Sequence, residues 1–153
     1  MKSRVAGRWV ARLATKQKVI YVGVFLPPEE RQWLLKKFPP EHSVVQADHL
    51  TVWFHTWGVP IDLSSLAFGE QISLKVIGYA EDGRAQAILV QPPSDLRPHA
   101  RVPHITISTA PGVQPIYSNV LVKADSKRIA PFTLRGRLGW WDGNSPVFEN
   151  PVL

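Results

Sequence analysis

The order of apolar and polar residues divides the chain into several short strands and one clear helix. A continuous apolar run, Val19–Leu26, is typical of a strand buried on both faces, and we expect Tyr21 to lie in the core with it. Two prolines end the run. Pro28 and the two glutamates behind it suit the first turn of a helix, because proline presets the backbone and acids favour the positive end of the helix dipole. We expect this helix to reach about Phe38, before a second pair of prolines.

Strand signals dominate the rest of the sequence. Asp82 and Gly83, between two of these signals, predict a hairpin turn. Many strands with one or two helices, and without regular strand–helix alternation, favour an α+β fold with antiparallel pairing in residues 19–153. The segments expected to form strands are Ala47–Phe54, Ile72–Ala80, Ala85–Gln91, Val102–Thr109, Asn119–Val122 and Phe132–Trp140.

Length and composition indicate one globular domain. The chain has 153 residues, of which 44% are hydrophobic and 20% charged, values that argue against a disordered protein. It contains no cysteine, which excludes disulfides, thiol catalysis and thiolate zinc sites. The sequence has no apolar run near the roughly 20 residues that cross a bilayer, and no secretory signal. We therefore expect a protein of the cytoplasm without membrane contact. We also expect a monomer.

The net charge of +6 comes from the first part of the chain. Residues 1–18 carry six basic side chains and no acidic one, whereas the remaining residues hold equal numbers of both signs. We call residues 1–18 the basic arm. A basic arm on a neutral body predicts contact with an anionic partner, of which nucleic acid is the usual example, and a solvated tail is the alternative.

Two short segments repeat one order of side chains and carry the candidate chemistry. His49–Val52 and His104–Ile107 each read histidine, aliphatic, threonine, aliphatic. Alternate side chains of a strand point to opposite faces, so each histidine is expected to share a face with the threonine two positions on. The same alternation adds Trp53 to the first face and Ser108 to the second. The candidate catalytic residues are His49, Thr51, His104 and Thr106.

The paired motifs suit acid–base chemistry at phosphorus. Imidazole titrates near neutral pH, so two histidines can act as base and acid in one reaction. Displacement at phosphorus is in line, which fits one histidine on each side, and threonine hydroxyls can donate to the non-bridging oxygens. Metal binding is the competing interpretation. Two histidines alone make a poor site and Asp48 and Asp95 lack ligand spacing, so we expect neither a metal nor another cofactor.

The motifs and their surroundings resemble the 2H phosphoesterase superfamily. The closer resemblance is to the cyclic phosphodiesterase domain of plant- and fungal-type tRNA ligases, over about residues 19–123. It rests on the stretches YVGVFLP, ADHLTVWFH, ISLKVIGYAEDGRAQAILV and VPHITISTAPGVQPIYSN. The resemblance implies two pseudo-symmetric lobes of antiparallel sheet with few helices, and an active-site cleft between the lobes. It also implies metal-independent catalysis, with the two histidines as the acid–base pair and the two threonines as phosphate binders.

The activity expected from this resemblance is hydrolysis of 2′,3′-cyclic phosphates at RNA 3′ ends or on nucleotides, giving a 2′-phosphate. Two alternatives remain open: cleavage of 3′–5′ bonds in RNA tails or cyclic-nucleotide signals, and a non-catalytic module that binds RNA ends. Trp53 is a candidate to stack on a base. Ser108 joins it as a substrate-binding candidate, as do Arg135 and Arg137, whose alternation with two leucines makes a basic strand face.

Overall fold

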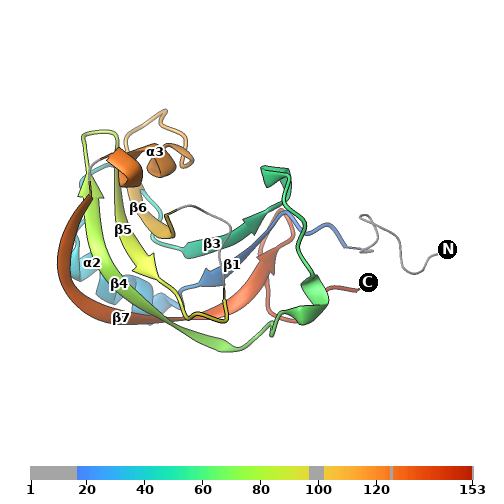
Figure 1. Cartoon of the computed structure of the whole chain (residues 1–153). Helices are drawn as coiled ribbons and strands as arrows, with labels where there is room; N and C mark the ends of the chain where they lie inside the picture. The colour runs from blue at the N-terminus through green and yellow to red at the C-terminus, as the bar shows by residue number, and fades with distance from the viewer. Residues whose placement is uncertain (1–16, 97–101, 125, 153) are drawn as a thin grey trace.

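The computed structural model describes residues 17–96, 102–124 and 126–152, so nearly all of the basic arm (residues 1–18) lies outside the described residues (Figure 1). Its helices are α2 (Pro28–Lys37) and α3 (Tyr117–Ala124), with two 3-10 turns, η1 (His55–Trp57) and η2 (Leu63–Ser65). Its strands are β1 (Tyr21–Phe25), β2 (Val44–Val45), β3 (His49–Phe54), β4 (Gln71–Glu81), β5 (Ala85–Gln91), β6 (His104–Thr109), β7 (Ser126–Trp141) and β8 (Pro146–Val147).

All eight strands belong to one antiparallel sheet. Its hydrogen-bonded order is β1-β3-β6-β5-β4-β7-β8, with β2 beside β6. A further pairing of β1 with β7 closes the sheet on itself. Figure 1 shows β4 and β7 as a long curved pair, with β3 and β1 crossing the middle of the molecule. The α+β class and the antiparallel pairing are confirmed. Two separate lobes are not seen, because continuous strand pairing joins both motifs and β7 in a single sheet.

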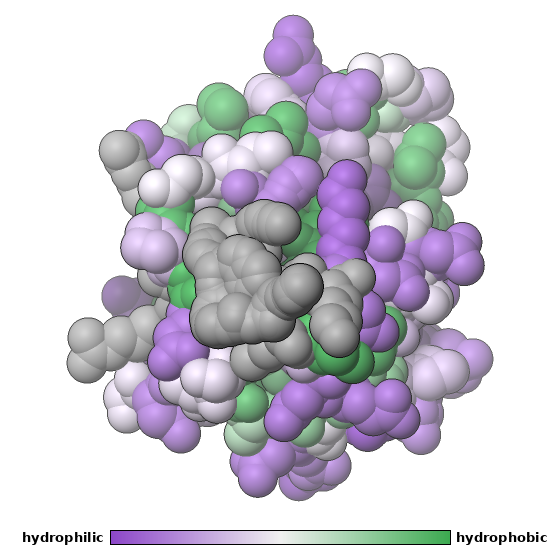
Figure 2. Space-filling model, turned by 90° about the vertical axis from the view of Figure 1, so that its right-hand side faces the viewer, coloured by the Kyte–Doolittle hydropathy of each residue, from purple (hydrophilic) through white to green (hydrophobic). Residues whose placement is uncertain are grey.

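The main core fills the inside of this closed sheet. Val22 and Val24 of β1 and Leu74 and Leu134 of the β4–β7 pair are fully buried there. Helix α2 covers the core with Leu34, which is also fully buried. The core side of β1 and of β3 to β7 is thus apolar, and the opposite side of β3 and β6 is left for the site. On the side shown in Figure 2, hydrophilic residues form most of the coloured surface and hydrophobic ones appear in separate areas.

Helix α3 replaces the strand expected at Asn119–Val122. Its buried residues are Ser118, Leu121 and Val122, which follow the three- and four-residue spacing of a helix face. Leu121 and Val122 form a second core cluster with small residues of both strands beneath the helix, Ala80 of β4 and Ala85 and Ala87 of β5. The strand prediction was wrong because a short apolar run has no periodicity that separates the two structures. No helix in the described part of the chain is both long and apolar enough to cross a membrane.

Candidate active site

The two histidine–threonine motifs lie on neighbouring strands, β3 and β6. Leu50 and Ile105, the second residues of the two motifs, pair in antiparallel register and are both fully buried. Continuing this register by one residue in either direction places each histidine opposite the threonine of the other motif. Because the two aliphatic side chains point into the core, the histidines and threonines point outward from the sheet. The four candidate residues therefore gather around one cross-strand pair.

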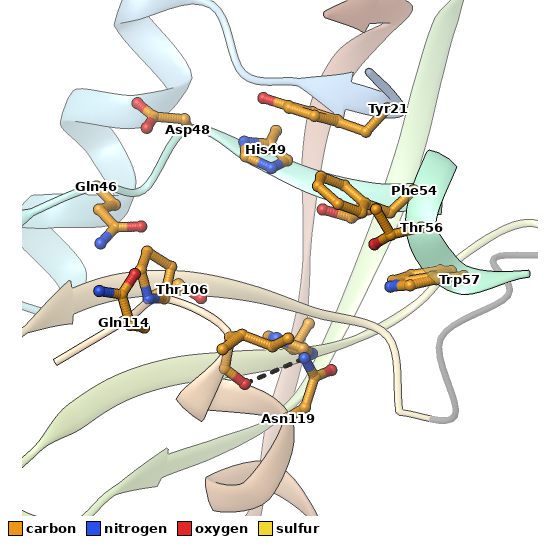
Figure 3. Close-up of a pocket in the computed structure, with 14 residues that line it drawn as sticks. Tyr21, Gln46, Asp48, His49, Phe54, Thr56, Trp57, Thr106, Gln114 and Asn119 are labelled. Atoms are coloured by element: carbon orange, nitrogen blue, oxygen red, sulfur yellow. Dashed lines mark hydrogen bonds between the residues drawn. The ribbon is translucent and has the colours of Figure 1, made fainter. Parts of the chain in front are cut away.

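A pocket of about 350 Å³ lies over this junction (Figure 3). All four candidate catalytic residues line it and are half-buried. In Figure 3, His49 and Tyr21 lie on one side of the pocket, while Thr106, Gln114 and Asn119 lie on the other. The residues that line the pocket are Tyr21, Gln46, Asp48, His49, Thr51, Phe54, Thr56, Trp57, His104, Thr106, Gln114, Pro115, Ile116 and Asn119.

Aromatic rings hold the imidazole of His49. The ring of Tyr21 stacks on it with centroids 4.7 Å apart, and the ring of Phe25 lies 5.5 Å away. Gly23 allows this approach, since a Cβ there would lie 2.8 Å from the carbonyl oxygen of Leu50 and 3.5 Å from Cδ2 of His49. Burial, with a smaller effect of the neighbouring His104, lowers the pKa of His49 to about 4. His49 is therefore neutral at pH 7 and can accept a proton.

The imidazole of His104 is held by a hydrogen bond. Its Nδ1 lies 2.8 Å from the carbonyl oxygen of Val102, and because a carbonyl can only accept, Nδ1 carries the proton. This leaves Nε2 as the nitrogen that can exchange a proton with a ligand. Burial lowers the pKa of His104, and the hydrogen bond to Val102 partly offsets this by favouring the charged form.

The two threonines have different surroundings. The hydroxyl of Thr106 donates to Oγ of Ser118, 2.8 Å away, and Ser118 is fully buried on α3. Among the described residues, the hydroxyl of Thr51 has no hydrogen-bond partner, so it is available to a ligand. Thr106 therefore also joins β6 to α3, a link that the sequence motif gave no reason to expect.

A bulge at the last residue of each motif redirects the side chains that follow. On β3, Thr51 pairs with Gly23 and Trp53 with Val22, which leaves one extra residue, Val52, between the two pairs. On β6 the corresponding extra residue is Ile107, between the pairs that Thr106 and Ser108 make with β5. An extra residue breaks the two-residue alternation, so the side chains beyond it change face.

These bulges overturn two expected positions. Trp53 does not line the pocket; it packs against the core, and its Nε1 donates to the carbonyl oxygen of Val59 at 2.6 Å. Phe54 lines the pocket in its place. Ser108 is fully buried and donates to Oε1 of Gln86 at 2.6 Å, away from the pocket.

Arg135 and Arg137 also lie outside the pocket, exposed on β7. The backbone N–H of Arg135 donates to a carboxylate oxygen of Glu30. The guanidinium of Arg137 lies 4.2 Å from the ring centre of Phe148, and its Nε donates to the carbonyl oxygen of Gly69. The structure therefore does not bring these arginines to the histidines.

Several pocket residues had no signal in the sequence. Tyr21 was expected in the core, but its ring borders the pocket because β1 turns that side chain outward. Asp48 precedes His49 directly; Arg31 lies 3.6 Å from its carboxylate, and burial raises the pKa of Asp48 while Arg31 opposes that shift. The remaining unexpected residues come from the stretch before β3, the end of β3, η1, the loop before α3 and the start of α3. They are Gln46, Phe54, Thr56, Trp57, Gln114, Pro115, Ile116 and Asn119.

The described residues contain no group of three or more histidine, aspartate or glutamate side chains that could hold a metal ion. Asp48 lines the pocket beside His49, whereas Asp95 does not line it. The described residues thus give the two histidines no third ligand, and independence from metal remains a prediction.

Comparison with known proteins shows a likeness of fold. No protein-family model matches the sequence, and no curated protein does. Among solved structures, the chain is similar to the crystal structure of a fungal RNA kinase, with a TM-score of 0.59 and 14% sequence identity. The match covers 84% of this chain but only 46% of the solved chain. At this identity the likeness shows the fold alone: the chain has the sheet-rich α+β fold of part of that structure.

Proposed function

We propose that this protein hydrolyses 2′,3′-cyclic phosphates at RNA 3′ ends or on nucleotides, without a metal, by acid–base catalysis with His49 and His104. The observation that carries the proposal is the meeting of two histidine–threonine motifs at the Leu50–Ile105 pair, inside one pocket. The similar solved structure is that of an RNA kinase, which adds a separate reason to consider RNA as the substrate.

The surroundings of the two histidines favour different roles. A base must be neutral before the reaction, and the pKa of His49, lowered to about 4, keeps it neutral at pH 7. An acid must hold a proton. Burial lowers the pKa of His104 as well, but the hydrogen bond to the carbonyl oxygen of Val102 opposes that shift and favours the charged form, so His104 is the better placed of the two histidines to hold a proton. We therefore assign His49 as the base and His104 as the acid.

In the proposed reaction, His49 takes a proton from water as the water oxygen attacks phosphorus. A new P–O bond forms, and the bond to one ribose oxygen breaks on the opposite side. His104 gives its Nε2 proton to that departing oxygen, which becomes a hydroxyl. The cyclic diester becomes a phosphomonoester. By the family resemblance the departing oxygen is O3′, which leaves a 2′-phosphate on the product.

The other pocket residues suit the rest of a nucleotide. The hydroxyl of Thr51 lines the pocket and can donate to a non-bridging phosphate oxygen. The hydroxyl of Thr106 can do the same when its hydrogen bond with Ser118 is reversed, so that Ser118 donates and Thr106 accepts. Phe54 and Trp57 supply aromatic rings at one end of the pocket, and a base can stack there (Figure 3). These two residues take over the stacking role that the sequence had suggested for Trp53.

A substrate panel tests the proposal. The protein is incubated with EDTA and, in separate reactions, a 2′,3′-cyclic mononucleotide, an oligoribonucleotide ending in a 2′,3′-cyclic phosphate, and a cyclic dinucleotide. Hydrolysis of either of the first two supports the proposal. Hydrolysis of the cyclic dinucleotide alone favours cleavage of 3′–5′ bonds, and binding of the oligonucleotide without turnover favours a non-catalytic module. Loss of hydrolysis on chelation, with recovery on adding Zn²⁺ or Mn²⁺, contradicts the two-histidine scheme.

A further inference from the structure

We infer that the outer face of β1 and β7 beside the pocket binds the RNA strand on the 5′ side of the reacting end, with Arg137 contacting a backbone phosphate. We call this surface the β1–β7 face and define it by Tyr21, Phe25, Arg137, Trp141 and Phe148. The inference rests on the proposed function and narrows it: the preferred substrate is an RNA end several nucleotides long.

Backbone register places Arg137 on the same face of the sheet as His49. Phe25 of β1 pairs with His49 on one side and with Arg137 on the other. Directly paired residues point to the same side of a sheet, so the three side chains form one row across β3, β1 and β7. Neighbouring strands are about 4.8 Å apart, so the row spans about 10 Å. About three stacked nucleotides, at roughly 3.4 Å each, cover that distance, and fewer do so in an extended strand.

Aromatic rings cover the space between the pocket and Arg137. Tyr21 pairs with Trp141 across β1 and β7, and their rings are nearly parallel with centroids 5.9 Å apart. Phe148 meets the ring of Phe25 edge-on, also at 5.9 Å. Trp141 and Phe148 are partly exposed. Surfaces that bind single-stranded nucleic acid without sequence preference combine such rings with nearby cations.

The charge on Arg137 is held in place without being neutralised. Its Nε donates to the carbonyl oxygen of Gly69 and its Cζ lies 4.2 Å from the ring centre of Phe148. These contacts hold the guanidinium and leave its other N–H groups for a ligand. Neither Arg137 nor Arg135 forms an ion pair with any acidic group in the described part of the chain. A fixed planar cation suits a phosphate, because two N–H groups can bind one phosphate together.

Arg135 points to the same face but is the weaker candidate. It lies two residues along β7, beyond the end of the pairing with β1, and its backbone N–H binds the Glu30 carboxylate. That carboxylate reduces the attraction of Arg135 for phosphate. Arg137 is therefore the residue to test first.

The test compares substrates of increasing length. Oligoribonucleotides from one to about five nucleotides, each ending in a 2′,3′-cyclic phosphate, are assayed for kcat/KM with the unmodified protein and with Arg137→Gln. Arg128→Gln is the matched control, because Arg128 is an exposed arginine on the same strand, nine positions away and paired with Gly78. Equilibrium binding of the longest oligonucleotide is measured at several salt concentrations with all three proteins.

We expect kcat/KM to rise with length and then level off. In Arg137→Gln the increase in kcat/KM with length should be about tenfold smaller, which is the size expected for the loss of one hydrogen bond to a charged group. In Arg128→Gln the increase should be the same as in the unmodified protein. Arg137→Gln should also lower the slope of log affinity against log salt by about 0.7, because one phosphate contact is lost.

Equal kcat/KM at every length, or equal loss in both variants, would overturn the inference and leave the proposed function standing. If no substrate of any length is hydrolysed, the proposed function fails, and the binding measurements alone then decide whether Arg137 contacts the strand.

Discussion

Leu50 and Ile105 form the one register pair between β3 and β6, and each is the second residue of a histidine–threonine motif. The pair places the two histidines diagonally across the junction, each beside the threonine of the other motif. A phosphoryl group seated over the pair has an imidazole on either side, which is the arrangement that in-line displacement requires. Each group around this pair can be replaced separately, and the expected losses differ.

Loss of either histidine should reduce turnover strongly. We expect His49→Ala and His104→Ala each to lower kcat/KM on a cyclic-phosphate substrate by about 10²- to 10⁴-fold, because each removes one proton transfer. The double variant should be little worse than the poorer single one, since the two groups act as a unit. His55→Ala is a matched control, because His55 is exposed and does not line the pocket. A folded His104→Ala protein with unchanged turnover on every substrate would contradict the mechanism.

The dependence of turnover on pH should be bell-shaped and displaced toward acid. The rate should rise with pH as His49 loses its proton, near the pKa of about 4. It should fall at higher pH as His104 loses its proton, below the usual value near 6.5 because burial lowers that pKa. Because the two histidines interact, the apparent pKa that each limb of the profile gives belongs to the pair and not to one residue alone. A profile of kcat/KM that still rises above pH 8 would show that the base is another group.

Replacing Thr51 and replacing Thr106 should have different effects on turnover and on folding stability. Thr51→Ala should cost about 10²-fold in kcat, the effect of one lost donor to developing charge, with little change in folding stability. Thr106→Ala should lower both kcat and the free energy of unfolding, because its hydroxyl also binds buried Ser118 on α3. Thr→Ser at either position should retain more activity than alanine does. Kinetics and denaturant unfolding of the four variants check this; identical stability losses at both positions would count against the assigned contacts.

Folding stability should depend on the protonation of His49. Its pKa is about 4 in the folded protein and near 6.5 unfolded, so between those values the unfolded chain binds more protons. The contribution of His49 to stability is therefore complete above about pH 6.5 and is lost as the pH falls toward 4. His49→Gln should flatten the pH dependence in this window. Urea unfolding of both proteins at several pH values makes the comparison, and parallel curves would refute the buried neutral imidazole.

The alternation of side chains along a strand predicts the position of the two histidines and two threonines, but not that of the residues directly after the motifs. The histidines and threonines lie on regular strand, so the expectation that each pair shares a face holds. Trp53 and Ser108 were misplaced because a bulge comes directly before each of them, and a bulge depends on the neighbouring strand rather than on the local sequence. Their roles in substrate binding are withdrawn on that ground.

The pairing of strands that are far apart in the chain could not be predicted from the sequence either. The outward turn of Tyr21 and the row from His49 through Phe25 to Arg137 depend on β1 lying between β3 and β7. Helix α3 (Tyr117–Ala124) depends on small residues of β4 and β5 that accept its buried side. The antiparallel α+β class, by contrast, follows from short strand signals and turns that are local, as at Asp82 and Gly83.

The pairing of β1 with β7 makes the site depend on the order in which the chain is synthesised. Tyr21–Phe25 pairs with Arg137–Trp141, segments more than 110 residues apart. Contacts so distant in sequence form late and slow folding, because a long loop must close before they add any stability. A growing chain can pair β4 with β5 while β1 still presents an unpaired edge beside His49, and such edges favour aggregation. A protein cut short before β7 would therefore keep both motifs but lack the strand that closes the sheet around them.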